Sequence, residues 1–407
     1  RYPDMQVQPV PTPTRLRADP FESPDFYLID DLFTAEQKLV RSAMRDFVKR
    51  EITPIIDDYA QRGEFPAHMI QKFAQIGAFG ATIPIHYGGG GLDYIASGLM
   101  LQEIERGDSG MRSTLSVHNS LTMYPILTYG SEEQKQKYLP QLAKGELVGC
   151  FGLTEANYGS NPGGMQTNFI ERSDYYLLNG SKLWITNGPI ADLAVVWAKN
   201  EQGKIKGLLL EKGMEGFTTN EIERKWSLRA SRTGELVFND VKVPKSQLLP
   251  DASGLRAPLD CLDQARYGIA WGAVGAAMDC YETARRYAGE RIQFDKPIAG
   301  FQLVQKKLAE MLTDITKAQL VCWRLGTLKN GGAATTAQIS MAKRDNVDMA
   351  LRVARECRQI LGGMGIVGDY PIMRHMMNLE SVVTYEGTHD IHLLIMGAEI
   401  TGVSAFK

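Results

Sequence analysis

The sequence has no excess of charge of one sign and no long apolar run. Its 45 lysines and arginines and 47 aspartates and glutamates leave a formal net charge of −2. Without a basic excess the chain has little with which to neutralise phosphates, so nucleic acid is not an expected partner. No apolar run approaches the roughly 20 residues that span a bilayer, so we expect no membrane insertion.

Cysteine and the common catalytic motifs are also scarce. The five cysteines are scattered and form no CxxC pair. Such a set predicts reduced, mostly buried thiols in an intracellular protein. His389 and His392 are three residues apart, but no further ligand pattern accompanies them, and we predict no metal site. The chain also lacks a GxSxG elbow, a GK[ST] phosphate loop and a GxGxxG fingerprint.

The first residues carry several prolines and no apolar core of a secretory signal. We predict an extended segment over residues 1–25. A chain that starts at Arg1 leaves room for a removed transit peptide.

The remaining pattern divides into three regions, as expected for 407 residues. Residues 26–147 show helical periodicity, and Thr34 with Gln37 forms a capping-box signature. Residues 148–252 consist of short segments rich in β-branched and aromatic residues, and Asn179-Gly180 predicts a hairpin turn. Residues 253–407 return to long helical segments joined by short loops, which predicts a helical bundle.

Several glycine-, hydroxyl- or aromatic-rich stretches stand at the ends of predicted elements. They are HYGGGGLDY (86–94), FGLTEANYGSNPGG (151–164), WITNG (184–188), RIQF (291–294) and QILGGMG (359–365). Each could let a backbone, an aromatic face or an arginine approach a planar or phosphorylated ligand. Each also has an ordinary interpretation as a connection, strand end, surface arginine or helix cap.

Two polar stretches raise the question of a site. In ERGDSGMRSTLSV, Arg112, Ser113 and Ser116 fall within about one helical turn and could bind a carboxylate, or could form a solvated helix start. In TYEGTHDI, Glu386 lies at a break between helical patterns, either as a solvated turn residue or as a base.

The order of FGLTE, WITNG, LRASRTGELVFNDVKVP, RIQF, QILGGMGI and YEGTHDI resembles the acyl-CoA dehydrogenase family over nearly the whole chain. SGMRSTLSV, QARYGIAWG and MNLESVVTYEGTHDIH are most similar to its glutaryl-CoA dehydrogenase group. The resemblance implies an N-terminal all-α domain, a middle β domain and a C-terminal four-helix bundle, assembled as a homotetramer.

The same resemblance implies FAD as cofactor. The matching positions that would border the flavin, reach another subunit's FAD or lie near the pyrophosphate are Phe151, Leu153, Thr154, Trp184, Thr186, Arg291, Gln293, Phe294, Gln359, Gly362, Gly363, Thr388 and Asp390. At the position of Asp390 the wider family often has glutamine.

The resemblance makes Glu386 the catalytic base that removes the α-proton of a CoA thioester. Arg112, with Ser113 and Ser116, matches the pattern that binds the far carboxylate of a glutaryl chain, since burying that carboxylate unpaired would be costly. Glu105 and Tyr385 match the decarboxylating type. Two further positions, Ser160 and Arg266, match residues near the CoA moiety.

The expected reaction is dehydrogenation of glutaryl-CoA followed by decarboxylation to crotonyl-CoA and CO2, a step of lysine and tryptophan degradation. Electron-transfer flavoprotein is the expected acceptor. Three alternatives stay open: a short-chain acyl-CoA dehydrogenase, an oxidase that uses O2, and a non-decarboxylating glutaryl-CoA dehydrogenase. A catalytically inactive protein of the same fold is a further alternative. The expected compartment is the cytoplasm in a bacterium or the mitochondrial matrix in a eukaryote.

Overall fold

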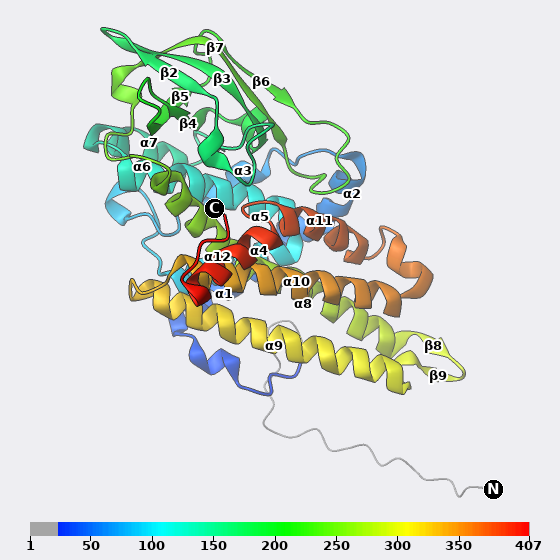
Figure 1. Ribbon diagram of the computed structural model, residues 1–407. Helices are drawn as coiled ribbons and strands as arrows, with labels where there is room; N and C mark the ends of the chain where they lie inside the picture. Colours follow the sequence, from blue (N-terminus) through cyan, green and yellow to red (C-terminus); the bar gives the residue numbers. More distant parts are fainter. Residues whose placement is uncertain (1–22, 407) are drawn as a thin grey trace, which may run out of the picture.

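The computed structural model describes residues 23–406, so the predicted extended segment 1–25 lies almost wholly outside the described residues. Helices occupy both ends of the chain and a curled sheet stands between them in sequence (Figure 1). The sheet packs on one side of the helical mass and the long helices of the bundle lie on the other. The predicted order of helical domain, β domain and helical bundle is confirmed.

The N-terminal domain is built from seven α-helices, and the predicted capping box starts the first of them. The Thr34 hydroxyl accepts from the Gln37 N–H at 3.2 Å, and the Gln37 side chain accepts from the Thr34 N–H at 3.0 Å. The helices are α1 (Ala35–Phe47), α2 (Thr53–Arg62), α3 (Met69–Gln75), α4 (Tyr94–Gly107), α5 (Ser109–Ser116), α6 (Tyr124–Tyr129) and α7 (Glu132–Ala143).

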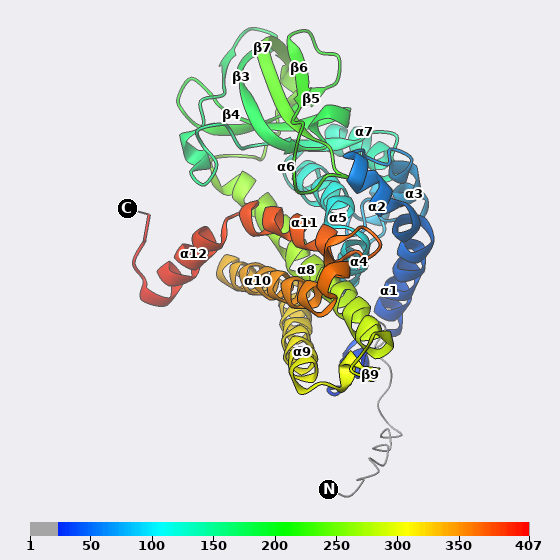
Figure 2. The ribbon, with the colours of Figure 1, turned by 90° about the vertical axis from the view of Figure 1, so that its right-hand side faces the viewer.

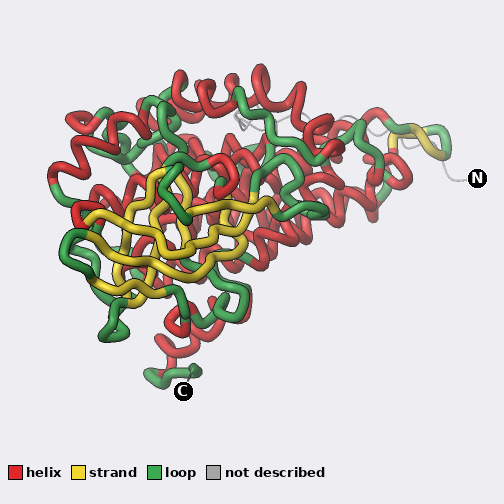
Figure 3. Tube along the Cα trace, turned by 90° about the horizontal axis from the view of Figure 1, so that it is seen from above, coloured by secondary structure: helices red, strands yellow, loops and turns green. Residues whose placement is uncertain are grey.

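The middle domain is a seven-stranded sheet with strand order β1-β4-β2-β3-β7-β6 and β5 paired with β4. Its strands are β1 (Gly149–Gly152), β2 (Asn168–Glu171), β3 (Tyr175–Thr186), β4 (Leu193–Lys199), β5 (Ile205–Glu211), β6 (Phe217–Glu221) and β7 (Thr233–Pro244). Figure 3 shows the sheet from above, lying across the helices beneath it.

The hairpin predicted at Asn179-Gly180 is wrong. Both residues lie inside β3, at a register shift against β7. Gly180 has φ 137°, and a Cβ there would come within 2.6 Å of the Thr167 hydroxyl. The Asn179 amide donates to Asp240 at 2.9 Å on the partner strand. Asparagine and glycine therefore serve a β-bulge here, which needs the same backbone freedom as a turn.

The C-terminal bundle contains the long helices α8 (Arg256–Glu290), α9 (Gln302–Asn330), α10 (Thr336–Ile360) and α11 (Ile372–Thr384). A last helix, α12 (His389–Thr401), projects from the side of the bundle (Figure 2). Glycines let α8 approach α4 closely: a Cβ on Gly275 would lie 1.9 Å from the Gln102 carbonyl oxygen. This close crossing brings the N-terminal domain and the bundle together around the polar stretch on α5.

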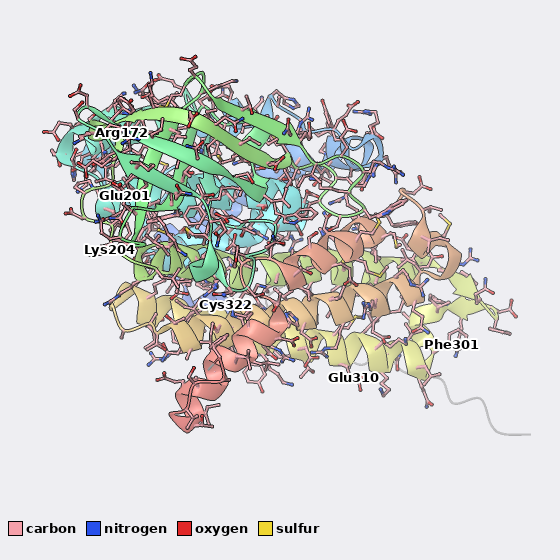
Figure 4. All side chains as sticks on the ribbon, turned by 45° about the horizontal axis from the view of Figure 1, so that its top comes forward. Arg172, Glu201, Lys204, Phe301, Glu310 and Cys322 are labelled. Carbon is pink, nitrogen blue, oxygen red and sulfur yellow. The ribbon has the colours of Figure 1, made fainter. Side chains whose placement is uncertain are left out.

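The small hairpin of β8 (Ile292–Gln293) and β9 (Lys296–Pro297) lies beyond the end of α8, far from the sheet. Figure 4 places Phe301 and Glu310 toward this end of the molecule and Arg172, Glu201 and Lys204 at the opposite end, on the β domain. All five cysteines are buried free thiols, as predicted. Within residues 23–406, no helix is long and apolar enough to cross a membrane.

Candidate active site

The turn that joins α11 to α12 has an unusual backbone. Glu386 has φ 51° and Gly387 has φ 91°, both in the left-handed region that glycine tolerates and glutamate rarely adopts. A Cβ on Gly387 would lie 2.7 Å from His392 Nε2, so glycine also makes room for this buried ring. Thr388 then caps α12, because its hydroxyl accepts from the Ile391 N–H at 3.2 Å. The glutamate is thus held between two helix ends.

Two buried cations hold the main chain of this turn. Arg266 Nε donates to the Glu386 carbonyl oxygen at 2.9 Å. Lys343 Nζ donates to the carbonyl oxygens of Val382, Tyr385 and Gly387 at 2.8, 3.0 and 2.9 Å.

Lys343 belongs to none of the motifs considered in the sequence. A signal was present, because Ile339, Lys343, Asn346 and Ala350 recur at helical spacing along the buried face of α10. A lysine within such a stripe is rarely buried unless its ammonium has partners.

One oxygen of the Glu386 carboxylate has no hydrogen-bond partner among the described residues. Its residue is partly exposed, but Oε2 is buried and forms no hydrogen bond within the described part of the chain. Burial raises the pKa of Glu386, and the positive charges of Arg112, Lys343 and Arg266 oppose that rise without cancelling it. A buried carboxylate with a raised pKa and an unoccupied oxygen is suited to accept a proton.

Arg112 lies at the other end of the cluster, on α5, with 0% of its surface exposed. Its Nε donates to Glu105 Oε2 at 2.5 Å, across the break between α4 and α5. Its Nη2 donates to the Tyr385 hydroxyl, and its guanidinium carbon lies 5.7 Å from the Tyr385 ring centroid. Because Tyr385 precedes Glu386, the arginine and the carboxylate belong to one site.

Electrostatics keep this cluster in defined charge states. Burial opposes the charge of Arg112, but Glu105, Tyr385 and Glu386 together outweigh burial and raise the pKa of Arg112. Burial raises the pKa of Tyr385, so its hydroxyl stays protonated near neutral pH. Ser113 and Ser116 are buried on the same helix, and the Ser116 hydroxyl has no hydrogen-bond partner among the described residues. The interpretation of this stretch as a solvated helix start is therefore wrong.

One glycine of α8 leaves space for the ion pair. A Cβ on Gly272 would lie 1.9 Å from Glu105 Oε2 and 3.2 Å from Arg112 Nε. Any larger side chain would displace both charged groups, so Gly272 is a site residue that the sequence motifs alone did not indicate.

The residues predicted to border a flavin lie at the edge of the β domain. Phe151 is buried in β1 with its ring edge-on to Trp197, and Leu153 is buried beside it. Trp184 has φ 64° near the end of β3, and 59% of its surface is exposed. Thr154, two residues after β1, and Thr186, the last residue of β3, are partly exposed. An exposed indole beside threonine hydroxyls suits contact with a planar ring system that accepts hydrogen bonds.

A second predicted set lies elsewhere in the molecule. One member of the set, Gln359, lies on α10, 16 residues from Lys343, the residue that binds the Glu386 turn. This spacing corresponds to about 24 Å along the helix. Arg291, Gln293 and Phe294 lie at the far hairpin, where Phe294 is 87% exposed. The structure therefore does not bring this set to Glu386 within one chain. The exposed members of the set also include Gln359, Gly362 and Gly363.

Three further predicted positions differ in their surroundings. Ser160 is exposed in the loop after β1, and Asp390 is exposed in the first turn of α12. Arg266 is buried against the backbone of the Glu386 turn, and it also bonds Asp263 at 3.1 Å. A separate cavity of about 240 Å³ lies beside Trp226, Tyr370 and other residues, and none of the predicted site residues lines it.

Glu386, with a buried and unpartnered Oε2 on a fixed turn within the electrostatic influence of Arg112, is the candidate general base of this site. Three family descriptions match successive parts of this chain: the N-terminal domain of acyl-CoA dehydrogenase over residues 34–146, its middle domain over 150–241 and its C-terminal domain over 252–401. The chain belongs to the acyl-CoA dehydrogenase family.

Relatives with different names resemble the chain along most of its length. An acyl-CoA dehydrogenase of Bacillus subtilis is 38% identical, covering 91% of this chain and 99% of that protein. A short-chain-specific acyl-CoA dehydrogenase of Clostridium acetobutylicum is 36% identical, with 91% and 100% coverage. A solved glutaryl-CoA dehydrogenase of Mycobacterium smegmatis in complex with FADH2 is 46% identical with a TM-score of 0.91, covering 93% of this chain and 97% of that one.

Proposed function

We propose that this acyl-CoA dehydrogenase oxidises glutaryl-CoA and decarboxylates the product to crotonyl-CoA and CO2. The observation that carries the proposal is Arg112, a fully buried guanidinium that contacts the tyrosine next to the proposed base. An acyl site for an unbranched apolar chain has no need of a buried cation, whose burial is costly. A substrate with a carboxylate at its far end gives that cation a function.

The arginine retains capacity for such a substrate. Glu105 and Tyr385 engage Nε and Nη2, whereas Nη1 has no hydrogen-bond partner among the described residues. The buried hydroxyls of Ser113 and Ser116 stand on the same helix. We infer that Arg112 binds the substrate's terminal carboxylate while Glu105 fixes the orientation of the guanidinium.

FAD is the cofactor. Phe151, Leu153 and Thr154 would border the flavin, and the exposed Trp184 with Thr186 would lie on its other side. When bound, FAD supplies the acceptor for the hydride that leaves the substrate's β-carbon. Thr388 and Asp390 at the start of α12 would lie near its pyrophosphate.

Glu386 takes the α-proton. Its Oε2 is unoccupied, and its raised pKa brings its basicity toward that of a proton acceptor at neutral pH. The main-chain N–H of Glu386 donates to no group of the described residues, so it is available to the thioester oxygen on which negative charge develops. One residue would thus both remove the proton and stabilise the enolate.

Decarboxylation follows from the same groups. Loss of CO2 from the unsaturated product breaks the bond to the terminal carboxylate and leaves its electron pair in a dienolate. Protonated Glu386 then returns a proton to carbon, giving crotonyl-CoA. In this step Arg112 would keep its hydrogen bonds to Glu105 and Tyr385 beside the departing carboxylate. Burial keeps the Tyr385 hydroxyl protonated.

A second candidate is oxidation of a short saturated acyl-CoA without decarboxylation. The observation that favours it is the Arg112–Glu105 pair itself, because the carboxylate already balances the charge of the arginine. The curated short-chain relative at 36% identity is consistent with this candidate.

The test is anaerobic addition of glutaryl-CoA or butyryl-CoA to the purified flavoprotein. Glutaryl-CoA is expected to bleach the flavin and to release CO2, and Glu386→Gln should bind the same substrate without bleaching, with a rate loss of about 10²–10⁴-fold. Bleaching by butyryl-CoA alone would reject the role of Arg112. Release of glutaconyl-CoA without CO2 would reject the decarboxylation.

The assembly and the electron acceptor are part of the proposal. Two predicted groups are expected to serve the FAD of a neighbouring subunit in a homotetramer. They are Arg291, Gln293 and Phe294 at the far hairpin and Gln359, Gly362 and Gly363 at the end of α10. Light scattering should then give four times the chain mass of 45.2 kDa. Comparing turnover with an electron-transfer flavoprotein and with O2 separates the dehydrogenase from the oxidase.

A further inference from the structure

Lys343 is a fully buried lysine whose charge lacks an acidic partner. It is 0% exposed, and no carboxylate of the described residues lies within ion-pair distance of its Nζ. Instead, the ammonium group donates to three main-chain carbonyl oxygens, those of Val382, Tyr385 and Gly387. An ammonium has three N–H donors, so all three are used, and a neutral amine could satisfy only two of these acceptors.

These acceptors surround Glu386 in sequence. Val382 belongs to the last turn of α11, where carbonyl groups have no partner within the helix. Tyr385 and Gly387 directly flank Glu386, whose φ of 51° is a conformation that surrounding contacts must enforce. The lysine therefore joins a helix end to a strained turn, while the Arg266 guanidinium holds the Glu386 carbonyl oxygen itself.

The charge of Lys343 also acts on the carboxylate. Burial is the main influence on both groups: it raises the pKa of Glu386 and lowers the pKa of Lys343 to about 7. Each of the two charges partly offsets this effect of burial on the other. The charged and titratable groups around the turn are Glu105, Arg112, Arg266, Lys343, Arg344, Asp348, Tyr385, Glu386, His389, Asp390 and His392.

We propose that Lys343 is a positioning residue for the base: its ammonium fixes the turn so that the Glu386 carboxylate stays unoccupied and aimed at the substrate, and its charge favours the ionised form of that carboxylate. The inference rests on the proposed role of Glu386 and extends it to a residue that contacts neither substrate nor flavin in the arrangement described.

The test uses the FAD-loaded enzyme and measures the rate of anaerobic flavin reduction against pH. Lys343→Met removes both the donors and the charge, and it is expected to slow reduction about 10²-fold through misplacement of the base. It should also move the acid limb of the pH profile to higher pH, because a cation near Glu386 is lost. Lys343→Arg keeps the charge and should leave the midpoint of that limb unchanged even where its rate falls.

A matched control exists in the β domain. The Lys225 ammonium also donates to three loop oxygens, those of Leu228 and Ser231 and the hydroxyl of Thr233, at 3.1, 2.6 and 2.9 Å. Burial lowers the pKa of Lys225 to about 8, yet its charge is not among those that act on Glu386. Lys225→Met is therefore expected to lower the thermal midpoint without moving the pH profile.

The outcomes separate the inference from the function on which it rests. If Lys343→Met lowers only the thermal midpoint, as Lys225→Met does, Lys343 is a structural residue and the inference is wrong. If Lys343→Met does not fold, Lys343→Gln replaces it, because glutamine keeps two N–H donors and loses the charge. An unshifted midpoint of the acid limb of the pH profile in Lys343→Gln overturns the proposal. Reduction at the wild-type rate by Glu386→Gln would instead reject the base, whatever Lys343 variants do.

Discussion

Glu103 and Glu105 are two residues apart on α4, so their side chains leave opposite faces of the helix. Both are 0% exposed and both pair with arginines. Glu103 accepts from Arg45 at 2.8 and 3.1 Å and from Gln102 at 3.3 Å, and Arg106 lies 3.7 Å away. Glu105 has the guanidinium of Arg112 as its ion-pair partner, and that guanidinium extends to the strained turn at Tyr385.

The two clusters differ in which buried polar atoms have no hydrogen-bond partner. Around Glu103, two arginines and an amide surround one carboxylate, and both of its oxygens accept hydrogen bonds. Arg45 Nη1 and Arg106 Nη1 have no partner among the described residues, and the adjoining cavity of about 10 Å³ has room for roughly one water molecule. Around Glu105, Arg112 Nη1 forms no hydrogen bond within the described residues, and the Ser116 hydroxyl and Glu386 Oε2 are buried without hydrogen-bond partners in the same part of the chain. A buried ion pair can therefore serve the fold or the site. Unpartnered guanidinium nitrogens occur beside Glu103 too, and the difference between the two clusters is the buried carboxylate oxygen without a partner, Glu386 Oε2, which lies near Arg112.

The largest expected effect comes from removing the arginine of each cluster. Arg112→Met should lower kcat/KM for glutaryl-CoA about 10²–10³-fold relative to butyryl-CoA, because the substrate carboxylate would be buried without a partner. Steady-state kinetics with the two thioesters measure this ratio. Arg45→Met should lower stability and leave the ratio unchanged.

The single Arg112 variant leaves Glu105 buried and unpaired, which could unfold the protein. The double variant Arg112→Met/Glu105→Gln removes both charges and keeps the test informative. An unchanged substrate ratio in the double variant would mean that this cluster, like that of Glu103, serves only the fold.

The domain order and most residues of the candidate site could be predicted from the sequence. The order of the three domains follows from local periodicity, and Arg112, Glu105, Tyr385 and Glu386 lie in short motifs that resemble those of a known family. The bonds of Lys343 join residues 39 to 44 positions apart, and local patterns carry no information about such contacts. The hairpin predicted at Asn179-Gly180 was wrong because the same residue types suit both a turn and the β-bulge that the structure has there.

The next effect concerns the space that α8 leaves for the Glu105 cluster. Gly272→Ala would place a Cβ 1.9 Å from Glu105 Oε2, so the ion pair must shift. We expect a loss of about tenfold in kcat/KM for glutaryl-CoA, corresponding to overpacking by about 1–3 kcal/mol. Gly289→Ala on the same helix, where a Cβ meets nothing within 4 Å, is the control and should leave kinetics unchanged.

If Gly272→Ala affected butyryl-CoA as strongly as glutaryl-CoA, the glycine would serve the packing of α4 on α8 and not the orientation of Arg112. The ratio between the two substrates, measured in both glycine variants, therefore shows whether the space is specific to the site.

The smallest expected effect is on stability: Glu103→Gln and Glu386→Gln should change the thermal midpoint in opposite directions. Burial alone would raise the pKa of Glu103, but Arg45 and Arg106 lower it below its ordinary value, whereas burial prevails and raises the pKa of Glu386. A lowered carboxylate pKa stabilises the fold above the pKa of the unfolded chain, and a raised one destabilises it there. Glu103→Gln should therefore lower the thermal midpoint near pH 8.

Glu386→Gln should do the opposite, because it removes a buried charge whose ionisation opposes folding. The expected rise in the thermal midpoint is about 1–2 °C near pH 8. The gain should vanish as the pH falls below about 4, where the carboxylate of the unfolded chain is protonated as well. Thermal unfolding of the FAD-loaded wild type and both variants at the two pH values measures the signs. A loss of stability in Glu386→Gln near pH 8 would mean that Lys343, Arg112 and Arg266 hold this carboxylate as the arginines hold Glu103, as a structural anion and not as a base kept ready for a proton.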